Sequence, residues 1–253
     1  MKQIIAPVRS NEEIMPGIHL LWVEAPQLVS HAQPGQFVMV RTSDDHDPLL
    51  RRPLSIHRVG ENGSLALLFN IVGRGTNWLA QCKAGEGIDL FGPLGRSFEV
   101  HSQNLLLVAG GIGIAPLVFL AEKSVADGRQ VTLLSGAKTA DGIYPRHLLP
   151  PDITYVTITE DGSLSKRGLV TDLLAELAES SQKDIQIFAC GPTCMYKTMS
   201  ALRHLEGKSI QVSTEVMMGC GFGGCAGCTI ETKRGLKMVC KDGPIFELSD
   251  LIW

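Results

Sequence analysis

The chain has 253 residues, enough for two ordinary domains and a small appendage, and 44% of them are hydrophobic and 19% charged, as in typical globular proteins. A net charge of −3 gives no reason to expect nucleic acid or an anionic membrane as a partner. No apolar stretch is long enough for a signal peptide or a membrane span, and seven cysteines with four in one group suit a reducing compartment, so we expect a cytoplasmic protein.

Residues 1–100 carry the pattern of antiparallel β-structure. Short apolar or alternating runs are separated by turn formers such as the Pro-Gly pair at 34–35 and the Asn-Gly pair at 62–63. This spacing predicts a barrel or sandwich, interrupted by one short helix that begins near Gly75. The expected strands are Ile14–Val23, Gln36–Arg41, Leu54–Val59, Leu65–Val72 and Ile88–Phe91.

The pattern changes at about residue 101. Leu105–Val108 is a continuous apolar run, which is typical of a parallel strand buried on both faces. Strand-like and helical segments then alternate up to residue 213, which predicts a doubly wound α/β domain. Further strands are expected at Val131–Leu134, Tyr155–Thr159, Ile185–Ala189 and Ile210–Val212, and helices at Pro116–Ala126, Leu169–Leu177 and Met195–Leu202.

Residues 214–253 form a third segment that is organised around cysteines. Cys220, Cys225 and Cys228 have C-x4-C-x2-C spacing, and Cys240 stands alone further on, which matches the ligand pattern of a plant-type [2Fe–2S] cluster. Glycines between the cysteines accept positive φ and leave room for inorganic sulfide. The segment is therefore predicted to be a small iron–sulfur module.

A structural zinc site and unligated core thiols are two alternatives that stay open for these cysteines. Zinc knuckles usually present their ligands as two separate hooks, whereas three of the cysteines here share one loop, so we favour the iron–sulfur cluster. Such a cluster carries one electron at a time. A two-electron donor would therefore need a flavin in between, and the rest of the chain should hold a flavin site and a nicotinamide site.

A candidate flavin site lies in the segment Leu50–Ile56. Arg52 can neutralise a pyrophosphate with paired N–H bonds, and Ser55 can bond the edge of an isoalloxazine ring. The first amides of the short helix at Gly75-Thr76 suit the same pyrophosphate. Taken alone, arginines before a proline are more readily explained by a solvated strand end.

A candidate nicotinamide site lies in the segment Ala109–Pro116, which follows the first buried strand. It is an incomplete G-x-G-x-x-G without an acidic residue about twenty positions on, so alone it is also compatible with a mere tight turn. The glycines are Gly110, Gly111 and Gly113. The later strand Ile185–Ala189 is followed by Cys190-Gly191-Pro192, which we expect beside the nicotinamide.

These motifs, in this order and on elements of these types, resemble those of the ferredoxin-NADP reductase superfamily. With its C-terminal cysteines, the whole chain resembles the electron-transfer subunits of type B dihydroorotate dehydrogenases. The resemblance is closest at Arg52–Ser55, Gly75-Thr76, Asp161–Ser163, Gly168–Asp172 and Val239–Pro244. It implies an FAD-binding β-barrel over residues 1–100, a NAD-binding α/β domain over 101–213 and a [2Fe–2S] module over 214–253.

Carried over by position, the resemblance implies the residues that hold each cofactor. FAD would be held by Arg52, Pro53, Leu54, Ser55, Leu68, Phe69, Asn70, Gly75 and Thr76. The nicotinamide would lie at Gly110, Gly111, Gly113, Cys190, Gly191 and Pro192, and the iron ligands would be Cys220, Cys225, Cys228 and Cys240. One departure is that Phe69-Asn70 stands where the family often has Tyr-Arg, a lost positive charge that weakens FAD binding or signals a sister family.

The resemblance also implies a function. Electrons would pass between NAD and the FMN of a catalytic dihydroorotate dehydrogenase subunit through the cluster and FAD, in a heterotetramer, and no side-chain acid or base of this chain would be needed. The alternatives are the corresponding subunit of an NAD(P)H:ferredoxin oxidoreductase, hydrogenase or sulfite reductase, and a zinc-stabilised scaffold module.

Several residues are harder to assign. NAD and NADP are not distinguished, because Lys138 and Arg146 can meet a 2′-phosphate or sit in a surface loop. The apolar tail Leu248–Trp253 is expected near the partner, with packing on its own domain as the alternative. Asp44–Asp47 is expected to be a solvated loop, and Cys82 and Cys194 to be packed thiols.

Overall fold

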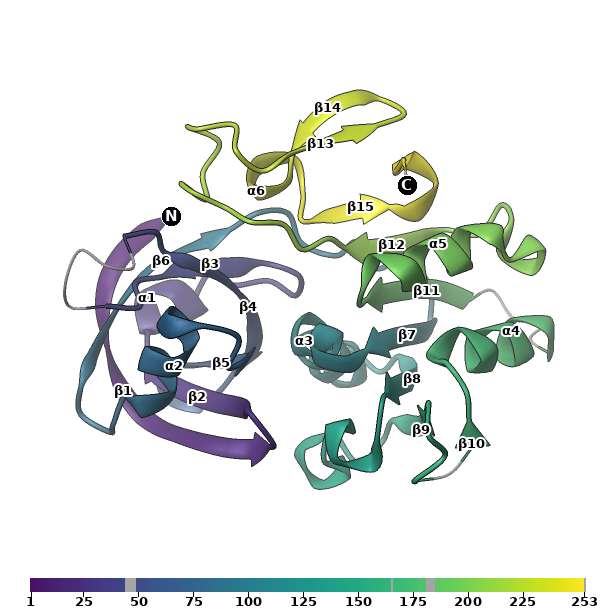
Figure 1. Ribbon diagram of the computed structural model, residues 1–253, viewed down its shortest axis with the longest axis horizontal. Helices are drawn as coiled ribbons and strands as arrows, with labels where there is room; N and C mark the ends of the chain where they lie inside the picture. The colour runs from purple at the N-terminus through teal and green to yellow at the C-terminus, as the bar shows by residue number, and fades with distance from the viewer. Residues whose placement is uncertain (44–48, 165, 181–184, 253) are drawn as a thin grey trace.

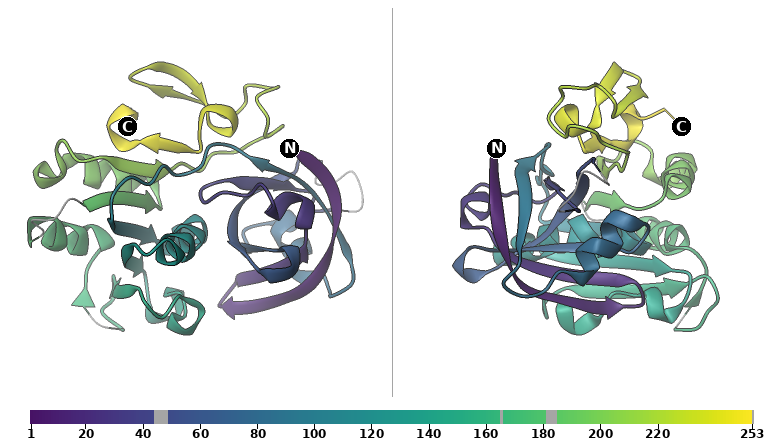
Figure 2. Two further views of the ribbon diagram at one scale, coloured as in Figure 1. Left: turned by 180° about the vertical axis from the view of Figure 1, so that it is seen from behind. Right: turned by 60° about the vertical axis from the view of Figure 1, so that its left-hand side comes forward.

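The computed structural model describes residues 1–43, 49–164, 166–180 and 185–252, with only the backbone described at 178–180. Two large domains lie side by side, and a smaller C-terminal module lies across one end of both (Figures 1 and 2). The segment Asp44–Asp47 and the terminal Trp253 lie outside the described residues, and so do the expectations made for them.

The N-terminal domain is a closed antiparallel barrel with the strand order β1-β2-β5-β4-β3-β6. Buried and exposed residues alternate along β6, as expected of a strand with one face toward the barrel interior. The strands are β1 (Lys2–Met15), β2 (Ile18–Glu24), β3 (Phe37–Val40), β4 (Arg52–Val59), β5 (Ser64–Asn70) and β6 (Gly87–Leu94), and the helices are α1 (Pro26–Val29) and α2 (Arg74–Gln81).

The strand expected at Ile14–Val23 is wrong. The chain turns at Pro16-Gly17, where Gly17 has a φ of +71°, and Met15 at the end of β1 pairs with Ile18 at the start of β2. Apolar residues stand on both sides of this tight turn, so the two strand ends look like one run. The rest of β1 was missed because exposed polar residues interrupt its apolar ones.

The second domain is built on a seven-stranded sheet with the order β10-β9-β8-β7-β11-β12-β15, in which every pair is parallel except β12–β15. The strands of this domain are β7 (Asn104–Gly110), β8 (Gln130–Ala137), β9 (Thr154–Thr159), β10 (Lys166–Arg167), β11 (Ile185–Cys190) and β12 (Ile210–Ser213). The helices are α3 (Ile114–Ala126), α4 (Val170–Ser180) and α5 (Thr193–Ala201).

Helices cover both faces of this sheet. On one face α3 is buried between the sheet and the barrel, because Leu117 and Leu120 share a core with Ala66 and Leu68 of β5. On the other face α4 and α5 share a second core with the strands. The chain order reverses between β7 and β11, and such a reversal leaves a crevice at the carboxyl ends of the strands where ligands commonly bind.

The C-terminal module holds a two-stranded hairpin and one strand of the large sheet. The hairpin is formed by β13 (Thr229–Thr232) and β14 (Gly235–Met238), followed by α6 (Val239–Asp242). Strand β15 (Ile245–Glu247) then pairs with β12. Short 3-10 turns complete the chain at Glu61–Gly63, Gly111–Gly113, Ala140–Gly142, Arg146–Leu148, Arg203–Leu205 and Leu248–Asp250.

Candidate functional site

A cavity of about 680 Å³ opens where the barrel, the sheet and the C-terminal module meet. Its walls come from β4 and β5, from the start of α3, and from the segment Ser213–Met218, which leads from β12 to the cysteines. All of the residues predicted to hold FAD line it except Gly75, namely Arg52, Pro53, Leu54, Ser55, Leu68, Phe69, Asn70 and Thr76.

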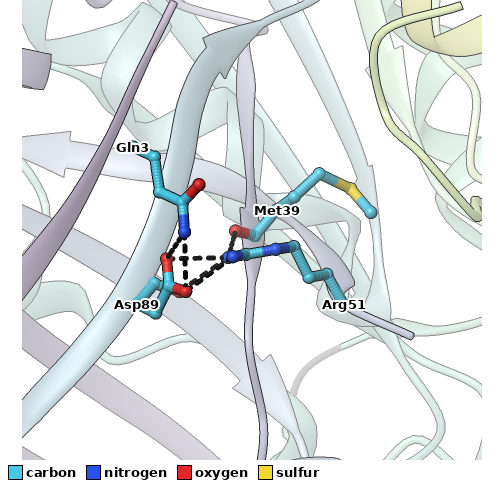
Figure 3. A network of polar contacts seen from close by, with 4 residues as sticks. All are labelled: Gln3, Met39, Arg51 and Asp89. Atoms are coloured by element: carbon cyan, nitrogen blue, oxygen red, sulfur yellow. Dashed lines mark hydrogen bonds and ion pairs between the residues drawn. The ribbon is translucent and has the colours of Figure 1, made fainter. Parts of the chain in front are cut away.

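The two neighbouring arginines at the cavity edge have different surroundings. Both terminal nitrogens of Arg51 donate to the carboxylate of Asp89, at 2.6 and 3.0 Å (Figure 3). Gln3 donates to the same carboxylate. Arg51 also donates to the carbonyl of Met39, so its charge is already paired by groups of β3 and β6. Among the described residues, Arg52 donates to the carbonyl of Leu50, and this single bond leaves most of its N–H groups for a ligand.

Helix α2 brings its first turn against the same corner of the cavity. A Cβ at Gly75 would lie 2.6 Å from Thr42 Oγ1 and 3.2 Å from Arg52 Nε, so glycine is needed for this approach. Thr76 Oγ1 accepts hydrogen bonds from the amides of Val72 and Gly73, which fixes the entry into the helix. Within the described part of the chain, the buried Thr42 hydroxyl has no hydrogen-bond partner.

These groups fit an FAD molecule. The Arg52 guanidinium, the orphaned hydroxyl of Thr42 and the positive end of the α2 dipole lie together, which suits a pyrophosphate. Leu68 and Phe69, both buried, supply apolar wall for a flat ring system. Asn70 lines the cavity where the family often carries arginine, so this wall supplies an amide rather than a charge.

The predicted nicotinamide residues meet at the reversal between β7 and β11. A Cβ at Gly113 would lie 2.1 Å from the carbonyl oxygen of Cys190, and one at Gly110 would lie 2.9 Å from Pro192. Gly111 has a φ of +55° and open space beside it. The two motifs, separated by most of the domain in sequence, are thus packed backbone against backbone beside the cavity, and a Cβ at Gly191 would lie 3.1 Å from the Cα of Gly110.

An acidic side chain at this point was not anticipated. Glu215, which lines the cavity, accepts a hydrogen bond from the Cys190 thiol at 3.9 Å. Burial, and then the negative charge of Glu215, raise the pKa of Cys190 well above its usual range, and burial raises the pKa of Glu215 as well. Tyr196 holds the region together by accepting from the Gly191 amide and donating to the Ser213 carbonyl. Cys190 is therefore a neutral thiol and no nucleophile.

The four predicted iron ligands fall into two pairs. The thiols of Cys220 and Cys225 contact each other, and so do those of Cys228 and Cys240. Among the described residues, no three Cys, His, Asp or Glu side chains are gathered as ligands of a single ion. A [2Fe–2S] cluster takes four cysteine thiolates, and Cys220, Cys225, Cys228 and Cys240 would supply them. The arrangement fits the cluster.

Backbone amides point at the sulfurs, as iron–sulfur sites require. The amide of Gly223 donates to Cys240 Sγ at 3.1 Å, and that of Gly224 donates to Cys220 Sγ at 3.2 Å. Burial raises the pKa of Cys220, but amide hydrogen bonds and the Cys225 thiol together lower it to about 6. Burial and the neighbouring Cys228 raise the pKa of Cys240 to about 12. Crowded thiols of this kind are stabilised as thiolates by a bound metal.

The cysteine loop rests on the barrel. A Cβ at Gly221, where φ is +80°, would lie 2.4 Å from Met39 Cγ, and the ring of Phe222 packs edge-on against Phe91 at 6.0 Å. Met218 lines the cavity and is separated from Cys220 by one glycine. A residue that lines the cavity and a predicted cluster ligand are therefore only two positions apart in the chain.

The remaining sequence expectations have mixed outcomes. Arg146 donates to the backbone carbonyls of a turn and is committed there, so it is not available for a 2′-phosphate, while Lys138 is exposed. Cys82 is buried as expected, but the expectation for Cys194 is wrong: it is exposed, because it stands on the solvent side of α5. Among the described residues, no helix is long and apolar enough to cross a membrane.

Sequence reasoning missed Glu215 and Thr42. Glu215 stands five residues before the first cysteine in a segment that looks like a linker, and Thr42 directly follows the expected strand Gln36–Arg41. A possible signal was the lone acidic residue directly before the apolar run Val216–Met218. Nothing in the sequence marks Thr42.

The family models that match the chain cover its second half. Residues 215–252 match the iron–sulfur cluster binding domain of dihydroorotate dehydrogenase B, and residues 107–201 match the oxidoreductase NAD-binding domain. The chain is 37% identical over 248 residues to the dihydroorotate dehydrogenase B (NAD(+)) electron transfer subunit of Desulforamulus reducens, covering 95% of this chain and 94% of that protein. The corresponding subunit of a Geobacillus species is 36% identical over 261 residues, covering 100% and 99%.

Solved structures show the same fold. A structure of an NADH-dependent reduced ferredoxin-NADP oxidoreductase, described in work on flavin-based electron bifurcation, superimposes with a TM-score of 0.89 at 30% identity, covering 99% of this chain and 90% of that one. The ferredoxin reductase in carbazole 1,9a-dioxygenase superimposes with a TM-score of 0.71 at 18% identity, over 83% and 68% of the two chains, and is similar in fold alone.

Proposed function

The chain belongs to the family of electron transfer subunits of dihydroorotate dehydrogenase B (NAD(+)), and from this premise we propose that it connects NAD to a catalytic subunit that oxidises dihydroorotate to orotate, a step of pyrimidine biosynthesis. The observation that carries the proposal is that one segment, Ser213–Met218, connects the three candidate cofactor sites. It lines the flavin cavity, lies beside the nicotinamide turn through Glu215 and Cys190, and leads through Gly219 into Cys220.

The chain's own residues bind and position the three redox groups. Arg52, Thr76 and the start of α2 would hold the FAD pyrophosphate, while Pro53–Ser55 and Leu68–Asn70 would line the ring system. When bound, FAD exchanges electron pairs with NAD and single electrons with a [2Fe–2S] cluster, so no acid or base of this chain is required. The nicotinamide would lie against Gly110, Gly111, Gly113 and Cys190–Pro192, and the cluster would be held by Cys220, Cys225, Cys228 and Cys240.

The partner would approach from the side of the cysteine loop. Cys225 is exposed and Cys220 half-buried, whereas Cys228 and Cys240 are buried at 3% and 2% relative exposure. Short distances favour electron transfer, so the FMN of the catalytic subunit would lie beyond Cys225. We further propose the three units 1–100, 101–213 and 214–253, a heterotetramer of two copies of each subunit, and a cytoplasmic location, which the reduced cysteines support.

Spectroscopy of the purified chain tests the cofactors. We expect flavin absorption together with iron–sulfur absorption, about two irons and two sulfides per chain, and bleaching of the flavin by NADH. A colourless protein with one zinc would refute the relay and support a zinc-stabilised scaffold. Co-expression with the FMN-binding subunit should give a complex that reduces NAD+ with dihydroorotate.

A second candidate function rests on the TM-score of 0.89 to the NADH-dependent reduced ferredoxin-NADP oxidoreductase. In that case the chain would pass electrons between a nicotinamide and a ferredoxin-linked partner. A purified complex that reduces ferredoxin with NADH but leaves dihydroorotate unchanged would favour this candidate. The commitment of Arg146 to backbone carbonyls favours NAD over NADP in either case.

A further inference from the structure

The seam between the barrel and the sheet domain contains a completely buried histidine with both ring nitrogens engaged. We propose that His57 is a positioning residue that fixes the nicotinamide turn relative to the flavin wall. This inference rests on the proposed function, because it concerns the alignment of NAD with FAD. Nothing in the sequence motif marks His57, which directly follows the segment assigned to the flavin.

On the barrel side, His57 belongs to the strand that lines the flavin cavity. It lies on β4, two residues after Ser55, and its side chain has 0% relative exposure. A buried imidazole with unpaired nitrogens would be strongly destabilising, so its partners determine where the neighbouring domain can sit. Because His57 and Ser55 share β4, a movement of the imidazole ring would also move Ser55.

On the other side, both partners belong to the sheet domain. His57 Nδ1 donates to the carbonyl of Ala115 at 2.8 Å, because a carbonyl can only accept. In the neutral ring Nε2 is then the acceptor for the hydroxyl of Tyr144, at 2.9 Å, and Tyr144 is itself 1% exposed. Burial lowers the pKa of His57 to about 3, and the Arg58 charge contributes, so the ring is neutral.

Ala115 connects the histidine to the nicotinamide turn. It lies in the first turn of α3, two residues after Gly113, and it lines the cavity together with Ile112. One hydrogen bond therefore joins the flavin-lining strand to the turn whose glycines pack against Cys190. A displacement of about 1 Å between reacting groups can lower a rate by about 100-fold, so a single such bond can matter.

The same seam offers a matched control. Arg58, the next residue on β4, forms an ion pair at 2.5 Å with Glu122, which lies seven residues further along α3. Seven residues correspond to about 10 Å of helix, so this contact joins the same two elements away from the nicotinamide turn. The Arg58 side chain also hydrogen-bonds Tyr144, and a substitution at Glu122 leaves that bond in place. Loss of the ion pair should weaken the packing of β4 against α3 without changing the orientation of the nicotinamide turn.

The test compares His57→Phe, His57→Asn and Glu122→Gln in the FAD-loaded protein. NAD+ is titrated into the dithionite-reduced form, and the long-wavelength charge-transfer absorption reports stacking of nicotinamide on flavin. We expect His57→Phe to bind FAD fully but to weaken NAD+ binding by about 10-fold and slow flavin reduction by NADH by about 10- to 100-fold. His57→Asn, which keeps an N–H near the Ala115 carbonyl, should recover most of both.

Glu122→Gln should also lower the melting temperature, while leaving the charge-transfer band unchanged. An unchanged band and rate in His57→Phe, or an equal loss in Glu122→Gln, would overturn the positioning role while the proposed function stands. A wild-type protein that holds FAD but shows neither the band nor reduction by NADH would overturn both.

Discussion

At the scale of single residues, the neighbouring Arg51 and Arg52 have separate tasks. Because Arg52 faces the cavity with most of its donors unused, Arg52→Ala should weaken FAD binding by about 10- to 100-fold, the loss of charge-assisted hydrogen bonds of about 1.5–3 kcal/mol. Titration of the apoprotein with FAD measures this.

Arg51→Ala serves as the matched control. It leaves Asp89, whose side chain is 11% exposed, without its cation, so it should destabilise the barrel and lower the melting temperature while FAD affinity stays near that of the wild type. The opposite result, with affinity lost in Arg51→Ala and kept in Arg52→Ala, would mean that the two side chains have exchanged roles in the loaded protein.

A second residue-scale prediction separates the two halves of the relay. Cys225→Ser removes the exposed thiolate, so the cluster should be lost, because a serine hydroxyl is a poor iron ligand at neutral pH. NADH should still reduce the flavin, and ferricyanide should still accept its electrons. Dihydroorotate-dependent reduction of NAD+ by the complex should fall to background.

Iron analysis verifies the loss, and Cys194→Ser, an exposed cysteine outside the loop, is the control. If NADH–ferricyanide activity disappeared together with the dihydroorotate reaction while FAD stayed bound, the cluster would not lie beyond the flavin. Survival of both activities without iron would make the cysteines structural.

His57 also predicts a dependence of stability on pH. Its pKa is lowered from 6.5 to about 3 in the folded chain, so the unfolded chain binds a proton that the folded one does not, and stability falls as the pH drops through 6.5 toward 3. Between pH 7 and pH 5 this amounts to about 2 kcal/mol. Urea unfolding of the wild type and of His57→Asn at both pH values measures it, and equal pH dependence in the two would contradict the assignment.

Candidate site residues could be proposed from the sequence where they belong to compact motifs. Local spacing and neighbouring residues mark the cysteines, Arg52–Ser55 and the glycines of Gly110–Gly113. Knowledge of the tertiary fold is not needed to find them. Glu215 and His57 do not, because their roles depend on which distant element packs against them. A contact between distant elements is a property of the tertiary fold and leaves no local pattern.

At the scale of elements, the contact between the two nicotinamide motifs depends on glycine at position 113. A Cβ there would lie 2.1 Å from the Cys190 carbonyl oxygen, so Gly113→Ala must push the ends of β7 and β11 apart. We expect a KM for NADH raised by about 10-fold or more, since misplacement of about 1 Å is costly, with FAD content unchanged.

Gly73→Ala is the control for that prediction. Its backbone is extended, with φ of −179°, and a Cβ there meets nothing within 4 Å, so kinetics should be unaffected. A wild-type KM in Gly113→Ala would show that the strand ends adapt and that the close packing is incidental.

Helices and strands could be predicted where buried residues recur along the sequence in one regular pattern. The continuous apolar run of β7 and the alternation of β6 identify strands at once. The hairpin of β1 and β2 was hidden, because apolar residues on both sides of Pro16-Gly17 merge into one run. Strands β13 to β15 were missed as well, since they are short and their pairing is set by the surrounding module.

At the scale of the whole molecule, part of the C-terminal tail packs on the chain's own sheet and part is exposed for a partner. Leu248 and Leu251 are both 5% exposed and belong to the core of the chain's own sheet, whereas Ile252 is 51% exposed. Deletion of residues 251–253 should therefore lower the melting temperature through Leu251, whereas Ile252→Ser should leave the fold intact and weaken only association with the catalytic subunit.

Size-exclusion chromatography of the co-expressed subunits tests this. Unchanged assembly of the Ile252→Ser variant would remove the tail from the interface. Trp253 lies outside the described residues, so the expectation that placed the tail near the partner is carried by Ile252 alone.

The pairing of β15 with β12 has a consequence for how such a protein can be built or inherited. Without the cluster module, β12 would be a bare sheet edge with open backbone donors and acceptors, a template for aggregation. A chain cut after residue 213 should therefore scatter light on concentration even with FAD bound. A gene fusion that gains or discards the iron–sulfur unit must cap that edge at the same moment, so the module cannot be exchanged as freely as a domain on a linker.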